Sequence, residues 1–250
     1  MAVIEVEGLR KRYRDTVAVR DIGFSVAEGE IFGIAGLNGA GKTTTVECIE
    51  GLRRPSGGRV RVLGLDPWRD RARLRQVVGS QLQDSMLPEK LRVGEALRLF
   101  RSFYRDGADP ETLLGELGIE TKRHTAFEDL SGGQRQRLSI ALALIGKPRI
   151  VVLDELTTGL DPVARRRTWE LIEKIRAGGV TVVLVTHFMD EADRLCDRLA
   201  IFHQGSVAAL DHPAALRAQL AASRGVLDVS LDEVFLAHTG AHPELAEEDA

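Results

Sequence analysis

The chain has 250 residues, is 44% hydrophobic and carries a formal net charge of −3. A chain of this length and apolar content can bury the core of one large domain, with or without a subdomain. The near-neutral charge excludes the electrostatic signature of a nucleic-acid-binding protein. Arginine-rich stretches at 71–75 and 165–167 stand among acidic residues, so we interpret them as solvated helix faces.

Neither a membrane span nor a disulfide framework is predicted. No apolar run approaches the roughly 18 residues that a membrane helix needs, and Met1 leads directly into a strand pattern without a signal peptide. Any membrane role is therefore expected to come through a partner. Cys48 and Cys196 lie in apolar helical patterns without a Cys or His at ligand spacing, so we interpret them as reduced core residues of a cytosolic protein.

The N-terminal segment has the pattern of β-structure. Residues 2–8 alternate in the manner of an edge strand, 11–14 are predicted as a polar turn, and further strands are predicted at 17–19 and 22–26. Tyr13 has two interpretations, an isolated surface aromatic or a platform on which a nucleotide base stacks.

Residues 36–43 match G-x-x-x-x-G-K-[ST], the pattern of a phosphate-binding loop. An apolar strand is predicted before it, at 31–35, and a helix after it, from Lys42 to about residue 50. Glycines let backbone N–H groups converge on phosphate oxygens, and the helix N-terminus adds partial positive charge. Lys42 is placed to reach the β- and γ-phosphates, and the Thr43 hydroxyl is placed to ligate Mg²⁺. The loop in this context predicts nucleotide binding.

The middle of the chain changes from strands to helices. Strands are predicted at 59–64 and 77–83, with a short basic helix at 69–76 between them. Three helices without intervening strands follow, the last of them opening at Arg135. Inside an α/β pattern this block indicates an inserted helical subdomain, at about 85–146.

The second half returns to alternating strands and helices. Residues 150–153 are a continuous apolar run, typical of a parallel strand buried on both faces. The run ends in Asp154 and Glu155, which we expect at the carboxyl edge of the sheet, where open α/β sheets bind ligands. A helix is predicted at 163–177 and a further apolar strand at 180–185.

Three polar features near these elements each have two interpretations. Ser131 to Gln134 form either a simple helix cap or a second anion site made of bare glycine backbone. Glu155 is either a surface acid or a general base that polarises an attacking water. His187 is either a satisfied core histidine or a hydrogen-bonding partner of phosphate and water.

In combination these motifs resemble ATP-binding cassette (ABC) ATPases, from residue 3 to about 215. In chain order they are the A-loop aromatic Tyr13, Walker A at 36–44, the Q-loop glutamine Gln83, the signature Leu130 to Gln134, Walker B with Glu155, the D-loop Gly159 to Asp161 and the switch histidine His187. The resemblance implies an α/β fold of the P-loop NTPase type: a RecA-like core sheet flanked by helices, an N-terminal antiparallel β subdomain and the inserted helical subdomain. It implies an ATPase domain at 1–220 and a C-terminal tail at 221–250, whose acidic end is expected to be disordered.

The resemblance also assigns a role to each motif residue. The expected catalytic residues are Lys42, Glu155 and His187. The expected metal-site residues are Thr43, Gln83 and Asp154. The expected nucleotide-binding residues are Tyr13, Gly36, Leu37, Asn38, Gly39, Ala40, Gly41, Lys42, Thr43, Thr44, Ser131, Gly132, Gly133, Gln134 and Asp161.

Two positions depart from the family pattern. Leu156 follows the carboxylate pair where the family usually has proline, a change at the turn that keeps both carboxylates. The Q-loop glutamine is commonly preceded by proline, whereas Leu82 precedes Gln83 here, and Gln81 stays a second candidate for this role.

Partners follow from the same resemblance. ABC cassettes stack head to tail in pairs, and each ATP lies between one Walker A and the other cassette's signature. This chain has one of each motif, so it is expected to pair with a second copy or a paralogue. The tail at 231–240 resembles the end of drug-exporter ATPases of the daunorubicin-resistance, ABC-2 type, which favours export over import.

We therefore predict an ATP-binding and ATP-hydrolysing subunit, with ATP and Mg²⁺ as cofactors. It would energise export of a small molecule or lipid-like substrate through a separate transmembrane permease subunit, and would lie in the cytoplasm against the inner face of the cell membrane. No nucleic-acid partner is expected. One alternative is a soluble ABC ATPase that acts on a macromolecular assembly, but those usually carry two cassettes or a long coiled-coil insertion. A second alternative is an inactive regulatory cassette, but every catalytic position is filled.

Overall fold

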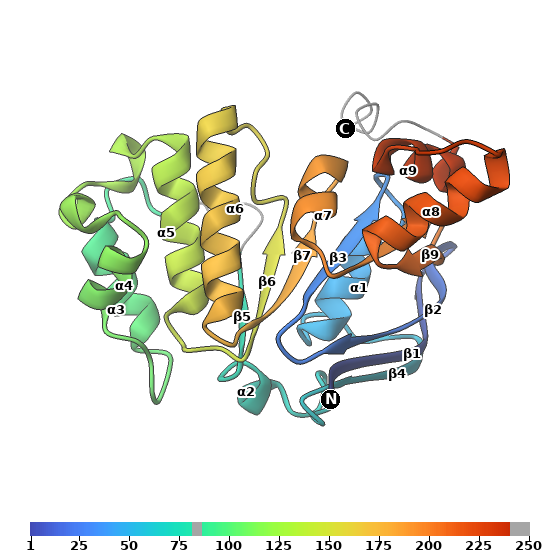
Figure 1. Ribbon diagram of the computed structural model, residues 1–250. Helices are drawn as coiled ribbons and strands as arrows, with labels where there is room; N and C mark the ends of the chain where they lie inside the picture. The colour runs from blue at the N-terminus through green and yellow to red at the C-terminus, as the bar shows by residue number, and fades with distance from the viewer. Residues whose placement is uncertain (82–86, 241–250) are drawn as a thin grey trace. The chain divides into compact units, whose positions relative to one another are not determined.

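The computed structural model describes residues 1–81 and 87–240 (Figure 1). Its backbone contacts separate two compact units, Met1–Leu74 with Val183–Ala250, and Arg75–Val182. Strand β7 (Thr181–Val185) carries the chain from the second unit back into the first. None of the described helices combines the length and the apolar character that crossing a membrane requires.

The first unit opens with an antiparallel sheet. Its strands are β1 (Ala2–Tyr13), β2 (Thr16–Ala27) and β4 (Gly57–Val62), with β1 hydrogen-bonded to both of the others. The prediction that residues 2–8 form an edge strand is therefore wrong, since β4 occupies the edge. The error has a physical reason: a central antiparallel strand with one buried face alternates just as an edge strand does.

The hairpin between β1 and β2 is tighter than expected. Residues 11–13, predicted as a polar turn, remain in β1, and Tyr13 is paired with Thr16. The chain reverses at Arg14, which adopts φ 46°. The two strand segments expected at 17–19 and 22–26 are one continuous strand, β2.

A second group of strands carries the phosphate loop. It comprises β3 (Ile31–Gly36), β8 (Arg198–His203) and β9 (Ser206–Asp211). Strand β3 is buried along its whole length and pairs in parallel with β8, which pairs antiparallel with β9. Within the first unit the strand order is β4-β1-β2-β9-β8-β3-β7. The sheet therefore contains both parallel and antiparallel pairs. Its buried strand β3 leads through the phosphate loop into helix α1.

Helices complete the first unit: α1 (Lys42–Ile49), α2 (Arg71–Leu74), α7 (Met189–Leu195), α8 (Pro213–Arg224) and α9 (Leu231–Thr239). Helix α2 is shorter than the basic helix predicted at 69–76, because Asp66 and Asp70 bind backbone N–H groups in the turn before it. Helices α8 and α9 pack together (Figure 1), and α9 begins with a capping box of Ser230 and Glu233.

The second unit contains the helical block. Its elements are β5 (Val78–Ser80), α3 (Val93–Arg101), α4 (Pro110–Glu116), the 3₁₀ turns η1 (Glu120–Lys122) and η2 (Phe127–Asp129), α5 (Gly132–Leu144), β6 (Ile150–Asp154) and α6 (Pro162–Ala177). Strands β5 and β6 pair in parallel. Helix α5 begins at Gly132, earlier than the predicted Arg135, because Ser131 is its N-cap residue and glycines are tolerated in a first turn.

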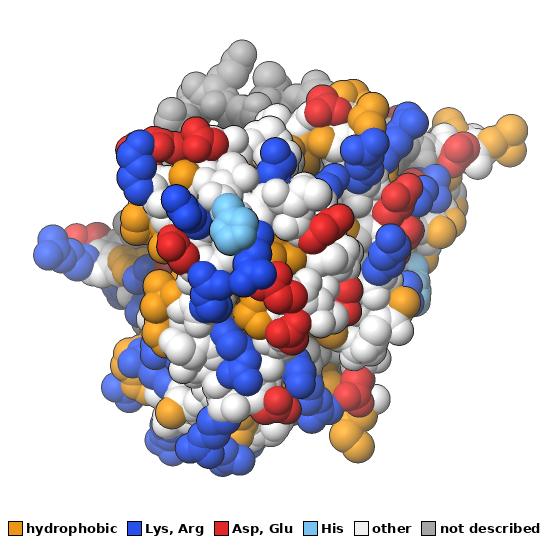
Figure 2. Space-filling view, turned by 90° about the vertical axis from the view of Figure 1, so that its left-hand side faces the viewer, with side chains coloured by type: hydrophobic (Ala, Val, Ile, Leu, Met, Phe, Trp, Pro, Cys, Tyr) orange, Lys and Arg blue, Asp and Glu red, His pale blue; other side chains and the backbone are white. Residues whose placement is uncertain are grey.

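The surface over the green helices of Figure 1 carries charges of both signs. Figure 2 shows Lys and Arg side chains interspersed with Asp and Glu over this face. In the second unit, Lys90 pairs with Glu128, and Arg123 pairs with Glu111 at 3.0 Å.

Candidate nucleotide-binding site

The phosphate loop joins the buried strand β3 to helix α1 within the first unit. Gly39 and Gly41 adopt the positive φ angles of 76° and 98° that L side chains rarely reach. A Cβ atom at Gly41 would also lie 2.7 Å from the carbonyl oxygen of Ala18, and one at Gly36 would lie 2.6 Å from that of Phe202. The glycine spacing is therefore required by backbone conformation and by close packing.

Lys42 is folded over this loop. Its Nζ donates to the carbonyl oxygens of Gly36 at 2.6 Å and Leu37 at 3.2 Å, and the residue is only 7% exposed. The next residue, Thr43, is exposed, whereas Thr45 is buried and its hydroxyl donates to the Gly41 carbonyl at 2.8 Å. One threonine thus fixes the helix start while Thr43 faces outward.

The first turn of α1 is capped by no side chain. Its N-cap residue is Gly41, which makes no side-chain cap hydrogen bond, and the turn contains no acidic residue. The first N–H groups of a helix have no intrahelical acceptor, and the helix dipole makes this end positive. The arrangement favours an anion such as the phosphates of a nucleotide.

The switch histidine follows strand β7 in the first unit. The N–H of Thr186 donates to the carbonyl of Ile34 in β3 at 3.1 Å, so the end of β7 is tied to the strand that leads into the phosphate loop. The His187 ring packs on Phe188 with centroids 4.0 Å apart. The His187 ring is half-buried, and this contact with Phe188 limits the rotamers that it can adopt.

The carboxylates lie in the second unit, at the end of β6. Asp154 is the last residue of that strand and is 9% exposed, and Glu155 follows in a left-handed conformation with φ 48°. Leu156, which replaces the family's usual proline, is fully buried. A positive φ is unusual for a residue with a Cβ, and it breaks the alternation of side-chain directions along β6 at Glu155. With leucine at position 156, both carboxylates therefore remain at the end of β6, and the buried Leu156 side chain holds the turn that follows.

The signature and the D-loop occupy helix N-termini of the same unit. Ser131 is the N-cap of α5, where its N–H donates to Gln134 Oε1 at 3.1 Å. Ser131 and Gly132 are exposed. Asp161 is the N-cap of α6, and its Oδ1 accepts from the N–H groups of Val163 and Ala164 at 2.9 and 3.0 Å. In this structure Asp161 therefore acts as a helix cap, and its nucleotide contact stays a prediction.

The predicted site residues thus form two groups, each within one unit. Tyr13, residues 36–44 and His187 belong to the first unit, and Ser131 to Gln134, Asp154, Glu155 and Asp161 belong to the second. Gln83 lies outside the described residues. Sequence reasoning did not find Arg53, whose guanidinium lies over the Tyr13 ring. The two residues are 40 positions apart, and no local pattern connects them.

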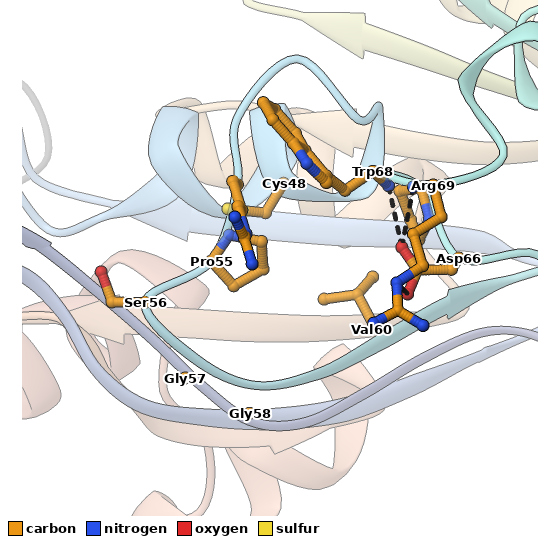
Figure 3. Close-up of a pocket in the computed structure, with 11 residues that line it drawn as sticks. Cys48, Pro55, Ser56, Gly57, Gly58, Val60, Asp66, Trp68 and Arg69 are labelled. Atoms are coloured by element: carbon orange, nitrogen blue, oxygen red, sulfur yellow. Dashed lines mark hydrogen bonds and ion pairs between the residues drawn. The ribbon is translucent and has the colours of Figure 1, made fainter.

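A separate cavity of about 260 Å³ lies behind the loop that follows α1 (Figure 3). Cys48, Val60 and Trp68 are among its lining residues, and Asp66 closes one side through hydrogen bonds to the N–H groups of Trp68 and Arg69. Burial raises the pKa of the Cys48 thiol to about 11, so it stays protonated at neutral pH. None of the lining residues belongs to a nucleotide motif, so we assign this cavity no nucleotide.

Comparison with known proteins decides the family. A family profile described as "ABC transporter" matches residues 19–158, more than half of the chain. The chain belongs to the ABC transporter family. The cassette is 39% identical over 218 residues to the Nod factor export ATP-binding protein I of Rhizobium johnstonii, an alignment that covers 85% of the cassette and 70% of that protein. With the protein of the same name from Bradyrhizobium diazoefficiens it shares 42% identity, with 85% and 71% coverage.

Solved structures agree with this assignment. The cassette superposes on an ATP-binding subunit of an ABC transporter with a TM-score of 0.83 and 30% identity, covering 94% of the cassette and 98% of that chain. A dimeric ATP-binding cassette in a post-hydrolysis state, bound to ADP and Pi, matches with a TM-score of 0.75 and 25% identity, over 84% and 98% of the two chains. The predicted α/β cassette fold and the predicted ATPase class are confirmed.

Proposed function

We propose that this cassette is the ATP-hydrolysing subunit of an exporter whose membrane-spanning subunit is a separate chain. The observation that carries the proposal is the start of α1, where Lys42 and a helix end capped by no side chain offer positive charge to phosphate. The curated relatives that we compared are named for export, which supports the direction of transport. The substrate class is the one expected from the sequence, a small molecule or lipid-like compound.

The donor groups fit Mg²⁺ as the second cofactor. Among the described residues no cluster of three or more His, Cys, Asp or Glu residues is arranged to hold a metal ion. Mg²⁺ needs no such cluster, because it is commonly held by one or two protein oxygens together with substrate phosphates and water. The exposed hydroxyl of Thr43 and the carboxylate of Asp154 supply hard oxygen donors of this kind. When bound, the ion neutralises charge on the β- and γ-phosphates.

The chain's own residues then divide the chemistry. Lys42 donates to the β- and γ-phosphates, and the N–H groups of α1 hold the phosphate oxygens. Glu155 accepts a proton from the attacking water, whose oxygen bonds to the γ-phosphorus as the bond to ADP breaks. His187 hydrogen-bonds the γ-phosphate and holds it in line with that water. The ring of Tyr13 stacks on the base.

A second cassette is the partner that the signature requires. Ser131 and Gly132 are exposed at the start of α5, and the first turn of that helix contains no acidic residue. This end suits the γ-phosphate of ATP bound to another copy or to a paralogue.

Two measurements test the proposal. The purified cassette should release phosphate from ATP in the presence of Mg²⁺ and stop when EDTA is added. Expressed in cells, it should fractionate with membranes only when its permease subunit is expressed too. A cassette that binds membranes equally well without any permease, or that turns over ATP only when a ribosome or DNA is added, would contradict the exporter assignment.

A further inference from the structure

A charged pair, Glu47 and Arg53, connects the helix after the phosphate loop to the ring that is expected to stack on the base. Glu47 lies in the second turn of α1, and Arg53 follows that helix. The two side chains pair through both guanidinium–carboxylate contacts, Nε to Oε2 and Nη2 to Oε1, the latter at 2.8 Å. The guanidinium carbon of Arg53 stands 5.1 Å from the centroid of the Tyr13 ring. The second turn of α1 and the aromatic ring are thus joined by two side-chain contacts.

The backbone around the ring is fixed as well. The segment after α1 is tied to the end of β1 by two hydrogen bonds, from Ser56 N–H to the Arg10 carbonyl at 2.8 Å and from Arg12 N–H to Ser56 Oγ at 3.1 Å. Lys11 Nζ donates to the Arg54 carbonyl at 2.8 Å and lies 5.0 Å from the Tyr13 ring centroid. The ring is therefore held against the loop that carries Arg53.

The bidentate pair suits a positioning role. A guanidinium is planar and packs on an aromatic ring, and a carboxylate that accepts two of its N–H groups fixes its plane. The hydrogen bonds that Arg53 donates to the Glu47 carboxylate raise the pKa of the guanidinium above its already high ordinary value. The side chains of Arg53 and Glu47 are 38% and 24% exposed, so the pair is partly shielded from water.

We propose that Arg53, held by Glu47, is a positioning residue that sets the Tyr13 ring for stacking on the base of the bound nucleotide. The proposal rests on the proposed function, because it assumes that ATP occupies the phosphate loop. It adds that affinity for the base depends on a side chain that contacts no phosphate. Base affinity and phosphate affinity are then separable by mutation.

The test compares ATP with inorganic tripolyphosphate, which carries the phosphates without the base, by titration calorimetry of the full chain. Stacking of a base on an aromatic side chain is worth about 1–3 kcal/mol, so Tyr13→Ala should weaken ATP binding by about 5- to 150-fold. Arg53→Ala should weaken it by about two- to fivefold, the size of a partly exposed cation–π contact. Neither change should alter the affinity for tripolyphosphate.

Four further variants extend the test. Glu47→Gln should reproduce part of the Arg53→Ala effect, and Arg53→Lys should restore part of the affinity. Arg54→Ala is the matched control, because this neighbouring arginine contributes its carbonyl, which alanine keeps, and should bind ATP as the wild type does. In the double variant Tyr13→Ala/Arg53→Ala, the loss should equal that of Tyr13→Ala alone.

Each contrary outcome has its own meaning. Unchanged ATP affinity in Arg53→Ala would overturn the positioning role. An equal loss of ATP and tripolyphosphate would also overturn it, because the change would then act on the phosphate loop or on folding. A wild-type chain that binds neither compound would instead overturn the proposed function itself.

Discussion

Helices α1 and α6 begin in opposite ways. At α6 the carboxylate of Asp161 accepts from the N–H groups of Val163 and Ala164, so the chain itself satisfies the start of the helix. At α1 the corresponding residue is Gly41, which has no side chain to offer. Unsatisfied helix N–H groups are costly unless something else accepts from them. A helix start without a side-chain cap, next to a lysine and a glycine loop, is the arrangement that we expect of an anion-binding site.

The capping of helix α5 is intermediate between that of α1 and that of α6. Its N-cap serine and Gln134 form a capping box, yet the first turn keeps two glycines and no acid. The end is thus partly satisfied by the chain and still open to a negative group. The proposed contact with a partner's nucleotide would need such an arrangement, because the helix must also be stable without that contact.

The largest expected effect is at the uncapped helix. Lys42→Ala should abolish ATP hydrolysis and weaken ATP binding by about 10- to 150-fold, the range expected for losing a charged hydrogen-bond donor. Calorimetric titration and phosphate release measure the two effects. Lys174→Ala, which removes an exposed lysine from the end of α6, is the control and should change neither. Wild-type affinity in Lys42→Ala would remove α1 from the nucleotide site.

The next effect separates binding at α1 from chemistry at β6. Glu155→Gln keeps the size of the side chain but cannot accept a proton, so hydrolysis should fall by about 10²–10⁴-fold. ATP should still bind, and a dimer held by ATP should persist in size-exclusion chromatography with MgATP. Asp154→Asn should instead weaken Mg²⁺-dependent binding and give no lasting dimer.

Glu170→Gln, an exposed acid on α6, is the control for this pair and should behave as the wild type does. A Glu155→Gln chain that hydrolyses ATP at the wild-type rate would exclude Glu155 as the base. An inactive chain that stays monomeric with ATP would keep Glu155 as the base and contradict pairing of two identical copies.

A smaller effect is expected at the capped helix. Asp161→Ala should lower the free energy of unfolding by about 1 kcal/mol, because two helix N–H groups lose their acceptor. Urea denaturation without nucleotide measures this loss. Asp161→Asn keeps a capping oxygen and should retain most of the stability. Equal stability of all three chains would mean that the Asp161 carboxylate does not stabilise α6.

The smallest effect concerns pH at another capped helix. Asp109 is the N-cap of α4, where hydrogen bonds from the backbone N–H and the hydroxyl of Thr112 hold the pKa of its carboxyl below the usual value. Because the folded pKa is depressed, this stabilisation is present above the ordinary carboxyl pKa of about 3.9 and is lost as the pH falls through the folded value. In the variant Asp109→Asn, the amide oxygen can still cap α4, but the side chain has no carboxyl group to titrate.

The stability difference between the wild type and Asp109→Asn should therefore shrink as the pH falls below about 4, measured by urea denaturation at each pH. If this difference in stability were the same at pH 7 and at pH values below the ordinary carboxyl pKa, the negative charge of Asp109 would not stabilise the cap.

Short-range patterns were sufficient for the motifs. The glycine spacing at 36–43 reflects positive φ angles and close backbone packing at single positions, which act locally. The apolar run at 150–153 is strand β6 because a strand buried on both faces must be apolar throughout. Family, fold and ATPase class followed from these patterns, and comparison with known proteins confirmed them.

Pairing between distant segments was decided only by the tertiary structure. The alternation of residues 2–8 is the same for an edge strand and a central one, so only the hydrogen bonds from β4 place β1 in the middle of its sheet. The contact of Arg53 with Tyr13 likewise depends on how the segment after α1 is tied to β1. Sequence by itself determined which residues have the right chemistry, because backbone conformation and burial restrict residue type position by position. Which of them touch depends on register and packing across the chain, and no local pattern encodes that.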